Sequence, residues 1–200
     1  MDSVDRIVAS MQAACEDVGI NEPTSDQVKE IIGLGLKEAL HTLFPDQEPS
    51  MYDRLTEQYR QHFVYQSKVE SRLFDGAHDT LVNLADSGYI LAVATGKARR
   101  GLDKVLEETG LSDLFEITRC ADETRSKPHP QMLYEIMNYL DVSPSQTLMV
   151  GDTEYDMAMA SAANTVSMGV SYGVHSKERL LAHEPVTCLD DIRDICKWLY

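Results

Sequence analysis

The amino-acid sequence is poor in positive charge. Its 200 residues include 18 Lys and Arg against 33 Asp and Glu, so the formal net charge is −15. Binding to nucleic acid or to anionic lipid depends on cations that interact with phosphate groups. We therefore expect no nucleic-acid partner and no membrane partner. An anionic small molecule would need a locally positive site within a repulsive overall field.

Long apolar runs and paired cysteines are also missing. No apolar run approaches the length of a membrane-spanning helix, and the N-terminus lacks the basic and apolar stretches of a secretion signal. The four cysteines form no C-x-x-C pair, and the six histidines do not cluster with them; they are Cys15, Cys120, Cys188 and Cys196. This pattern favours reduced thiols and a cytoplasmic location, and it argues against a zinc site.

The pattern of apolar residues divides the chain into two parts. In roughly the first third, helical patterns dominate: Val4, Ile7 and Met11 share one face, and further helices are expected at 25–34, 37–43 and 51–66. From Leu73 onward, apolar runs alternate with helical patterns. The runs predict strands at 89–94, 115–120, 147–150, 165–170 and 186–189, of which the first should be fully buried.

Strands that alternate with helices at this spacing predict an α/β fold with a doubly wound parallel sheet covered on both faces. The helical segment should form a domain of its own over residues 5–70. Residues 71–200 should form the α/β core, with residues 1–4 as the return from that core. We expect the connection between the two units near residues 67–75.

Polar residues stand where three of these strands end. Thr95 and Gly96 follow the first strand, Lys127 lies in the loop after the second, and Asp152 and Asp156 follow the third. Ligands of open parallel sheets bind at the carboxyl ends of the strands, so we expect these residues to converge. A hydroxyl, free backbone amides, a lysine and two carboxylates suit a phosphate held beside a divalent metal.

Each of these residues, taken singly, has a structural explanation. The carboxylates of Asp152 and Asp156 could lie on a solvated helix face, Thr95 could cap a helix, and Lys127 could be a surface charge. Their shared position at strand ends favours the functional interpretation.

Two glycine motifs nearby do not fit the nucleotide-binding patterns that they superficially match. Gly96-Lys97 is not a P-loop, because Ala98 follows where Ser or Thr is required. Gly33-x-Gly35 is not a dinucleotide fingerprint, because no predicted strand precedes it. Lys97 can add positive charge beside Thr95. Arg99 and Arg100 could do the same, but they fit a solvated helix face better.

The motifs together resemble those of haloacid dehalogenase-superfamily phosphatases with a helical cap, close to the phosphoglycolate phosphatase-like branch. The stretch AVAT with Thr95 resembles the second motif, SKPHP with Lys127 the third, and Gly151-Asp152 through Asp156 the fourth. The stretch LFDGAHDTL resembles the family's return from cap to core. The resemblance covers the whole chain, and it implies a Rossmann-like core with an α-helical cap.

The resemblance also implies an activity and residue roles. It implies Mg²⁺-dependent hydrolysis of a small phosphorylated metabolite, a phosphate monoester, through an aspartyl-phosphate. Thr95 and the amide of Gly96 would bind the phosphoryl group, and Lys127 would neutralise the nucleophile and the phosphate. Asp152 would bind Mg²⁺, and Asp156 would orient the metal, its waters or Lys127. The cap, residues 5–70, would exclude water and select the leaving group.

One family motif is missing from the sequence. No D-x-D-G-T, which supplies the nucleophile and the acid/base in the family, occurs in it, and the resemblance places that motif just ahead of Met1. We expect a full-length form to carry it. The alternative is a truncated or non-catalytic pseudo-phosphatase that acts as a binding module. Without the motif's central strand, the sheet should have a gap of about 10 Å, or two strand spacings.

Overall fold

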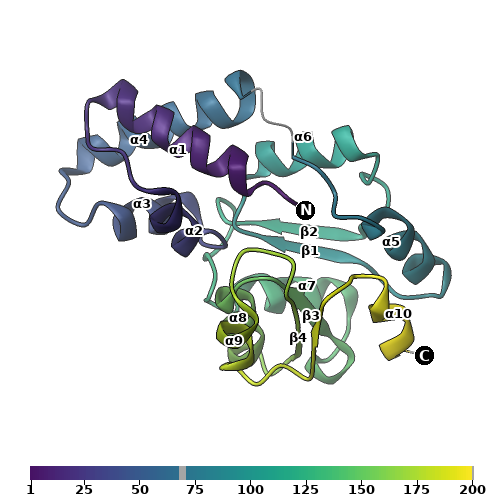
Figure 1. Cartoon of the computed structure of the whole chain (residues 1–200). Coiled ribbons are helices and arrows are strands. Elements are labelled where there is room, and N and C mark those ends of the chain that lie inside the picture. The colour runs from purple at the N-terminus through teal and green to yellow at the C-terminus, as the bar shows by residue number, and fades with distance from the viewer. Residues whose placement is uncertain (68–70, 200) are drawn as a thin grey trace.

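The computed structural model describes residues 1–67 and 71–199. Its first part is a helical block, which we define as residues 4–66 (Figure 1). The block contains α1 (Val4–Val18), α2 (Ser25–Ile31), α3 (Leu36–Leu43), α4 (Pro49–Arg60) and the π-helix η1 (Gln61–Gln66) that continues α4. The single helix predicted at 51–66 is therefore two consecutive helical segments.

The block has an apolar core of its own. Helix α1 presents buried residues such as Met11 and Cys15 at helical spacing, and it ends at Gly19. Gly19 adopts φ 77°, and its amide caps the last carbonyls of the helix. The other buried members come from α2, α3 and α4; they are Val28, Ile31, Ala39, Leu40 and Leu55.

The second part alternates strands and helices, as predicted. In chain order it contains α5 (Ala77–Asp86), β1 (Ala92–Thr95), α6 (Arg99–Thr109), β2 (Ile117–Cys120), α7 (Gln131–Leu140), η2 (Pro144–Gln146), β3 (Leu148–Gly151), α8 (Glu154–Ala162), β4 (Val166–Val170), α9 (Lys177–Leu181), β5 (Cys188–Leu189) and α10 (Asp194–Leu199). Every pairing between these strands is parallel. Helices α6 and α7 lie on opposite sides of the β1–β2 pair (Figure 1). The predicted α/β class is confirmed.

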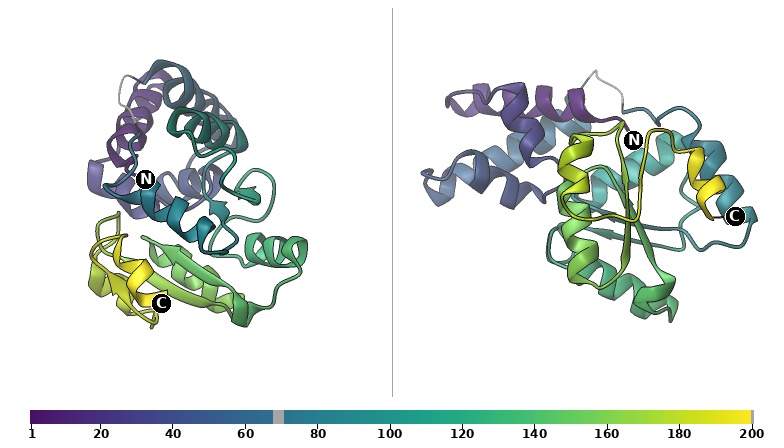
Figure 2. Two further views of the ribbon diagram at one scale, coloured as in Figure 1. Left: turned by 90° about the vertical axis from the view of Figure 1, so that its right-hand side faces the viewer. Right: turned by 60° about the horizontal axis from the view of Figure 1, so that its bottom comes forward.

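The strands form two sheets. Strands β1 and β2 pair with each other, and β3, β4 and β5 form a separate sheet in that order. Within the described part of the chain, β1 and β3 are not hydrogen-bonded to each other, which agrees with the gap expected at the centre of the sheet. Figure 2 shows both sheets and the helical block from two further sides.

The prediction of a fully buried strand at 89–94 is wrong. The strand is confined to Ala92–Thr95, and all four of its residues are only partly buried. Tyr89 and Ile90 precede it and are 39% and 58% exposed. An apolar run is buried only where neighbouring strands and helices cover it, and β1 pairs with β2 alone.

Two chain segments meet at the junction between the helical block and the α/β part. Asp2 and Arg72 form an antiparallel bridge, in which the Asp2 amide donates to Arg72 O at 2.7 Å and the Arg72 amide donates to Asp2 O at 3.0 Å. The predicted domain boundary at residue 70 lies outside the described residues, so the division into two domains stays a prediction. No described helix is long and apolar enough to cross a membrane.

Candidate functional site

A cavity of about 920 Å³ lies between the helical block and the carboxyl ends of β1 and β3. All five residues predicted for the site line it: Thr95, Gly96, Lys127, Asp152 and Asp156. The helical block supplies the opposite wall, which includes the loop between α2 and α3 and side chains of α1 and η1. The topology therefore brings the predicted residues together, while their chemical roles stay predictions.

Lys127 and Asp156 form a buried ion pair in this cavity. Lys127 Nζ donates to Asp156 Oδ1 at 2.5 Å. The second carboxylate oxygen, Oδ2, accepts from the amide and the hydroxyl of Thr153 at 3.1 and 2.7 Å. Thr153 is the N-cap of α8 and Asp156 its third residue, so the two form a capping box. Both oxygens of Asp156 are thus engaged, and the carboxylate holds the Lys127 ammonium in place.

Asp152, which directly follows β3, also presents a carboxylate to the cavity. Its Oδ2 accepts from the Val174 amide at 3.0 Å. Burial, and then the negative charge of Asp156, raise the pKa of Asp152 above its usual range. Gly173 is packed so closely against this carboxylate that a Cβ there would lie 2.2 Å from it. A bound cation would reduce the repulsion between the carboxylates of Asp152 and Asp156.

These residues fit a Mg²⁺ ion that takes only one or two of its ligands from the protein. Among the described residues, no group of three or more His, Cys, Asp and Glu side chains could hold a metal. Mg²⁺ is commonly bound through one or two carboxylates, with water and substrate phosphate as the other ligands. Asp152 can supply such a carboxylate. Asp156 was predicted as a metal residue, but its two oxygens already bind Lys127 and Thr153.

The loop after β1 is pressed against the helical block. A Cβ on Gly96 would lie 2.5 Å from Leu34 O and 2.7 Å from Gly33 O, so only glycine fits there. Gly33 itself has φ 110°, and the amide of Gly35 donates to Ser126 Oγ at 2.6 Å. This loop between α2 and α3 was not among the residues predicted for the site. Its only signal was the Gly33-x-Gly35 pair, which we considered only as a nucleotide motif.

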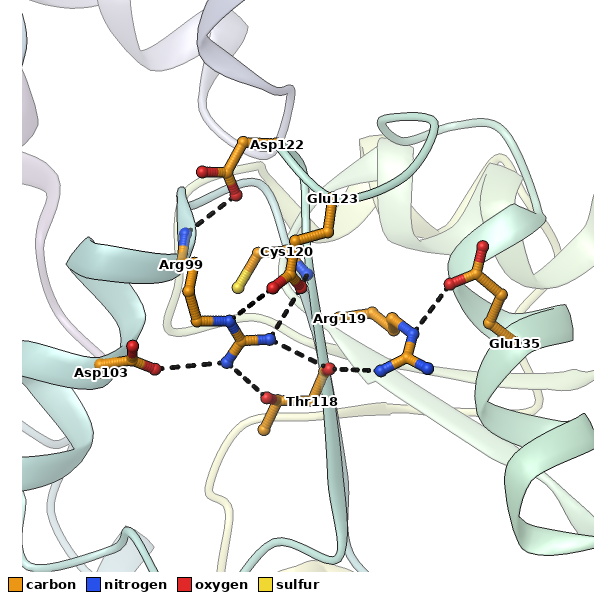
Figure 3. A network of polar contacts seen from close by, with 8 residues as sticks. All are labelled: Arg99, Asp103, Thr118, Arg119, Cys120, Asp122, Glu123 and Glu135. Carbon is orange, nitrogen blue, oxygen red and sulfur yellow. Dashed lines mark hydrogen bonds and ion pairs between the residues drawn. The ribbon is translucent and has the colours of Figure 1, made fainter.

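Arg99 connects the start of α6 to the loop after β2 (Figure 3). Its guanidinium binds both oxygens of Glu123 at 2.7 Å, and its Nη1 donates to Thr118 Oγ1 at 2.7 Å. The Arg99 amide donates to Asp122 Oδ1 at 2.9 Å. The expectation of a solvated face is therefore wrong for Arg99. Its planar, five-donor guanidinium joins the first turn of α6 to β2 and to the loop after β2.

A family model and curated relatives match most of the chain. A family model described as haloacid dehalogenase-like hydrolase matches residues 1–170. The chain is 31% identical over 201 residues to the probable phosphatase IndB of Dickeya dadantii (strain 3937), covering 98% of this chain and 86% of that protein. It is 28% identical over 178 residues to the pyrophosphatase PpaX of Anoxybacillus flavithermus, covering 88% and 80%.

Solved structures show the same architecture. The crystal structure of a predicted phosphoglycolate phosphatase from Haemophilus somnus 129PT superposes with a TM-score of 0.90 at 25% identity. That match covers 99% of this chain and 92% of the other. The family indicated by the sequence motifs is therefore confirmed, and the chain belongs to the haloacid dehalogenase-like hydrolases.

Proposed function

We propose that the protein hydrolyses small phosphate monoesters with Mg²⁺ as cofactor. The observation that carries the proposal is the buried Lys127–Asp156 pair, which lies in the same cavity as Thr95, Gly96 and Asp152. An ammonium fixed by a carboxylate beside a hydroxyl and a glycine amide suits the charge and shape of a transferring phosphoryl group. The names of the phosphatase and pyrophosphatase relatives support it.

Each residue has a defined part in this proposal. The Thr95 hydroxyl and the Gly96 amide bind the phosphoryl oxygens, and Lys127 neutralises their charge. Asp156 keeps the Lys127 ammonium aimed at the phosphoryl group. Asp152 holds Mg²⁺, which when bound neutralises developing charge on phosphate oxygens. The aspartyl-phosphate route needs a nucleophilic carboxylate, which the D-x-D-G-T motif supplies in the family.

The helical block, in this proposal, is the cap that closes the cavity. The Gly35–Ser126 hydrogen bond and the close approach of Gly96 to Leu34 bring the block against the phosphate-binding loops. Closure excludes water and presents residues of the block to the leaving group. We propose a small phosphorylated metabolite as substrate and, from the cysteine usage, a cytoplasmic location.

Hydrolysis assays test the proposal directly. Phosphoglycolate, pyrophosphate and an aryl phosphate are incubated with Mg²⁺ or with a chelator, using the 200-residue chain and a form extended by the D-x-D-G-T segment. We expect Mg²⁺-dependent turnover by the extended form, reduced about 10²- to 10³-fold in Lys127→Met. Lys177→Met, at an exposed pair with Asp190, is the control. Phosphate binding without turnover by either form would favour the binding-module alternative.

A further inference from the structure

Two cations lie against one aromatic ring where the helical block meets the cavity. Lys97 Nζ lies 5.1 Å from the centroid of the Phe63 ring, and Arg6 Cζ lies 4.6 Å from it. Arg6 is 4% exposed and donates from Nε to the backbone carbonyl of Phe63 at 3.0 Å. Lys97, Phe63 and Ser3 line the cavity. Positive charge is therefore concentrated at this wall of a chain that is otherwise strongly acidic.

Lys97 has a neutral hydrogen-bond partner. Its Nζ donates to Ser3 Oγ at 3.1 Å. Ser3 occupies the N-cap position of α1, but its hydroxyl does not cap that helix. Across residues 1–67 and 71–199, no carboxylate forms an ion pair with Lys97, whereas Lys127 in the same cavity is paired with Asp156. The ammonium of Lys97 is therefore positioned but not neutralised by these contacts.

The surroundings of Lys97 oppose its charge. Burial, and then the positive charges of Arg6 and Lys127, lower the pKa of Lys97 to about 8, while Asp152 acts in the opposite direction. A charge taken out of water is costly unless a counter-charge and hydrogen bonds compensate for it. An anionic ligand group beside Lys97 in the cavity would supply both the counter-charge and a hydrogen-bond acceptor.

The side chain of Lys97 also extends toward the helical block. Its backbone amide donates to Thr95 Oγ1 at 3.1 Å, so the residue begins at the proposed phosphate-binding loop. Its Nζ contacts Ser3, which directly precedes α1, and the ring of Phe63 in η1. A phosphate ester held at Thr95 with its leaving group toward the block would bring that leaving group to the ammonium.

We propose that Lys97 is a second anion-binding point, which selects substrates whose leaving group carries a carboxylate or a second phosphate beside the ester. This inference rests on the proposed phosphatase function, because it takes the phosphoryl group to lie at Thr95 and Lys127. Arg6 has an indirect part. It holds the Phe63 ring against Lys97 and adds positive electrostatic potential at this wall of the cavity.

Binding measurements with a matched pair of ligands test the inference. Phosphoglycolate carries an anionic group beside its phosphate, and ethyl phosphate carries none. Their dissociation constants are measured by calorimetry with the 200-residue chain and Mg²⁺ at pH 7. We expect phosphoglycolate to bind about ten-fold more tightly, which corresponds to one charge-assisted hydrogen bond. Lys97→Met should abolish this preference and change the affinity for ethyl phosphate little.

Two further variants make the result specific. Arg100→Met is the matched control, because Arg100 also lines the cavity and lies over an aromatic ring, at 5.1 Å from the Tyr65 centroid, but is exposed. It should keep the preference. Lys97→Gln removes the charge but keeps a donor for Ser3, and it replaces Lys97→Met if that variant does not fold.

The outcomes separate the two proposals. If neither ligand binds the wild-type chain, this inference fails, and turnover by the extended form still decides the proposed function separately. If both ligands bind but the wild-type chain shows no preference, the inference alone is wrong. The same conclusion follows if Lys97→Met or Lys97→Gln weakens both ligands equally.

Discussion

Lys127 and Asp156, which are 29 positions apart in the sequence, meet at 2.5 Å with side chains only 7% and 4% exposed. The pair joins the loop after β2 to the first turn of α8, across the gap between the two sheets. A buried ion pair depends on both partners, because either charge alone would remain in an environment that solvates it poorly.

Removing one partner of this pair should therefore destabilise the fold strongly. We expect Asp156→Asn to lower the free energy of unfolding by about 3–5 kcal/mol, measured by denaturant titration. The double variant Lys127→Met/Asp156→Leu should recover much of that loss, since it leaves no unpaired charge. A single variant as stable as the wild type would show that the cavity solvates the Lys127 ammonium.

Two glycine-to-alanine substitutions should have opposite effects. Gly96→Ala places a Cβ 2.5 Å from the Leu34 carbonyl oxygen, so the helical block has to shift. We expect a loss of about 1–3 kcal/mol in stability, with weaker binding of inorganic phosphate. Gly101→Ala lies within α6, where the new methyl group would be 3.7 Å from the Phe63 ring. It should add about 0.5–1 kcal/mol. Equal effects would contradict the packing described for Gly96.

Arg99→Lys should show how much the bidentate contact matters. Lysine keeps the charge but cannot bind both Glu123 oxygens and Thr118 together, and we expect a loss of about 1 kcal/mol in stability. Arg193→Lys, at the exposed pair with Asp191, should change little.

The effect of Arg99→Lys should also depend on pH. The Arg99 guanidinium holds the pKa of Glu123 below its usual range. The contribution of this contact is therefore present above the unfolded pKa of Glu123, near 4.5, and is lost as the pH falls through the lower folded pKa. Chemical denaturation at neutral and acidic pH measures the change, and a loss that persists in acid would contradict this assignment.

Lys97 should make stability rise with pH. Its folded pKa of about 8 lies below the 10.5 of an unfolded lysine, so between these values the unfolded chain binds more protons. Arg6, Lys127, Asp152 and the Met1 amino group all contribute to the field at Lys97.

The free energy of unfolding of the wild type, relative to Lys97→Met, should increase from pH 8 toward pH 10.5, as denaturant titrations at each pH would show. The pKa of Lys177 is raised by Asp190, so Lys177→Met should show no such increase. A flat difference for Lys97→Met would mean that Lys97 is well solvated.

The candidate site was predictable where local pattern and topology sufficed. Apolar runs located the ends of β1, β2 and β3, and a parallel sheet brings strand ends to one edge, so Thr95, Lys127 and Asp152 could be placed together from sequence. The burial of residues 89–94 could not be predicted from sequence, because it depends on which strands lie alongside β1.

Contacts between the two parts of the chain could not be predicted from local sequence patterns. Gly35 and Ser126 are 91 positions apart, and Lys97 and Ser3 are 94 apart. No periodicity links such residues, and the polar contacts of Lys97 and Arg99 depend on loop geometry. From sequence, Lys97 could therefore be predicted only to add positive charge, and Arg99 only to lie on a solvated helix face.

The Asp2–Arg72 bridge has a mechanical consequence. The two segments that bridge at the base of the helical block are hydrogen-bonded to each other. The α2–α3 side of the block is held by the Gly35 amide, which donates to Ser126 Oγ, and by Glu30, whose carbonyl accepts from Tyr155 and whose carboxylate pairs with Arg179. Separation of the block from the α/β part at Gly35 would leave the Asp2–Arg72 pairing intact. The pairing then acts as a hinge, and loss of the contacts of Gly35 and Glu30 would widen the cavity mouth most on the side of α2 and α3.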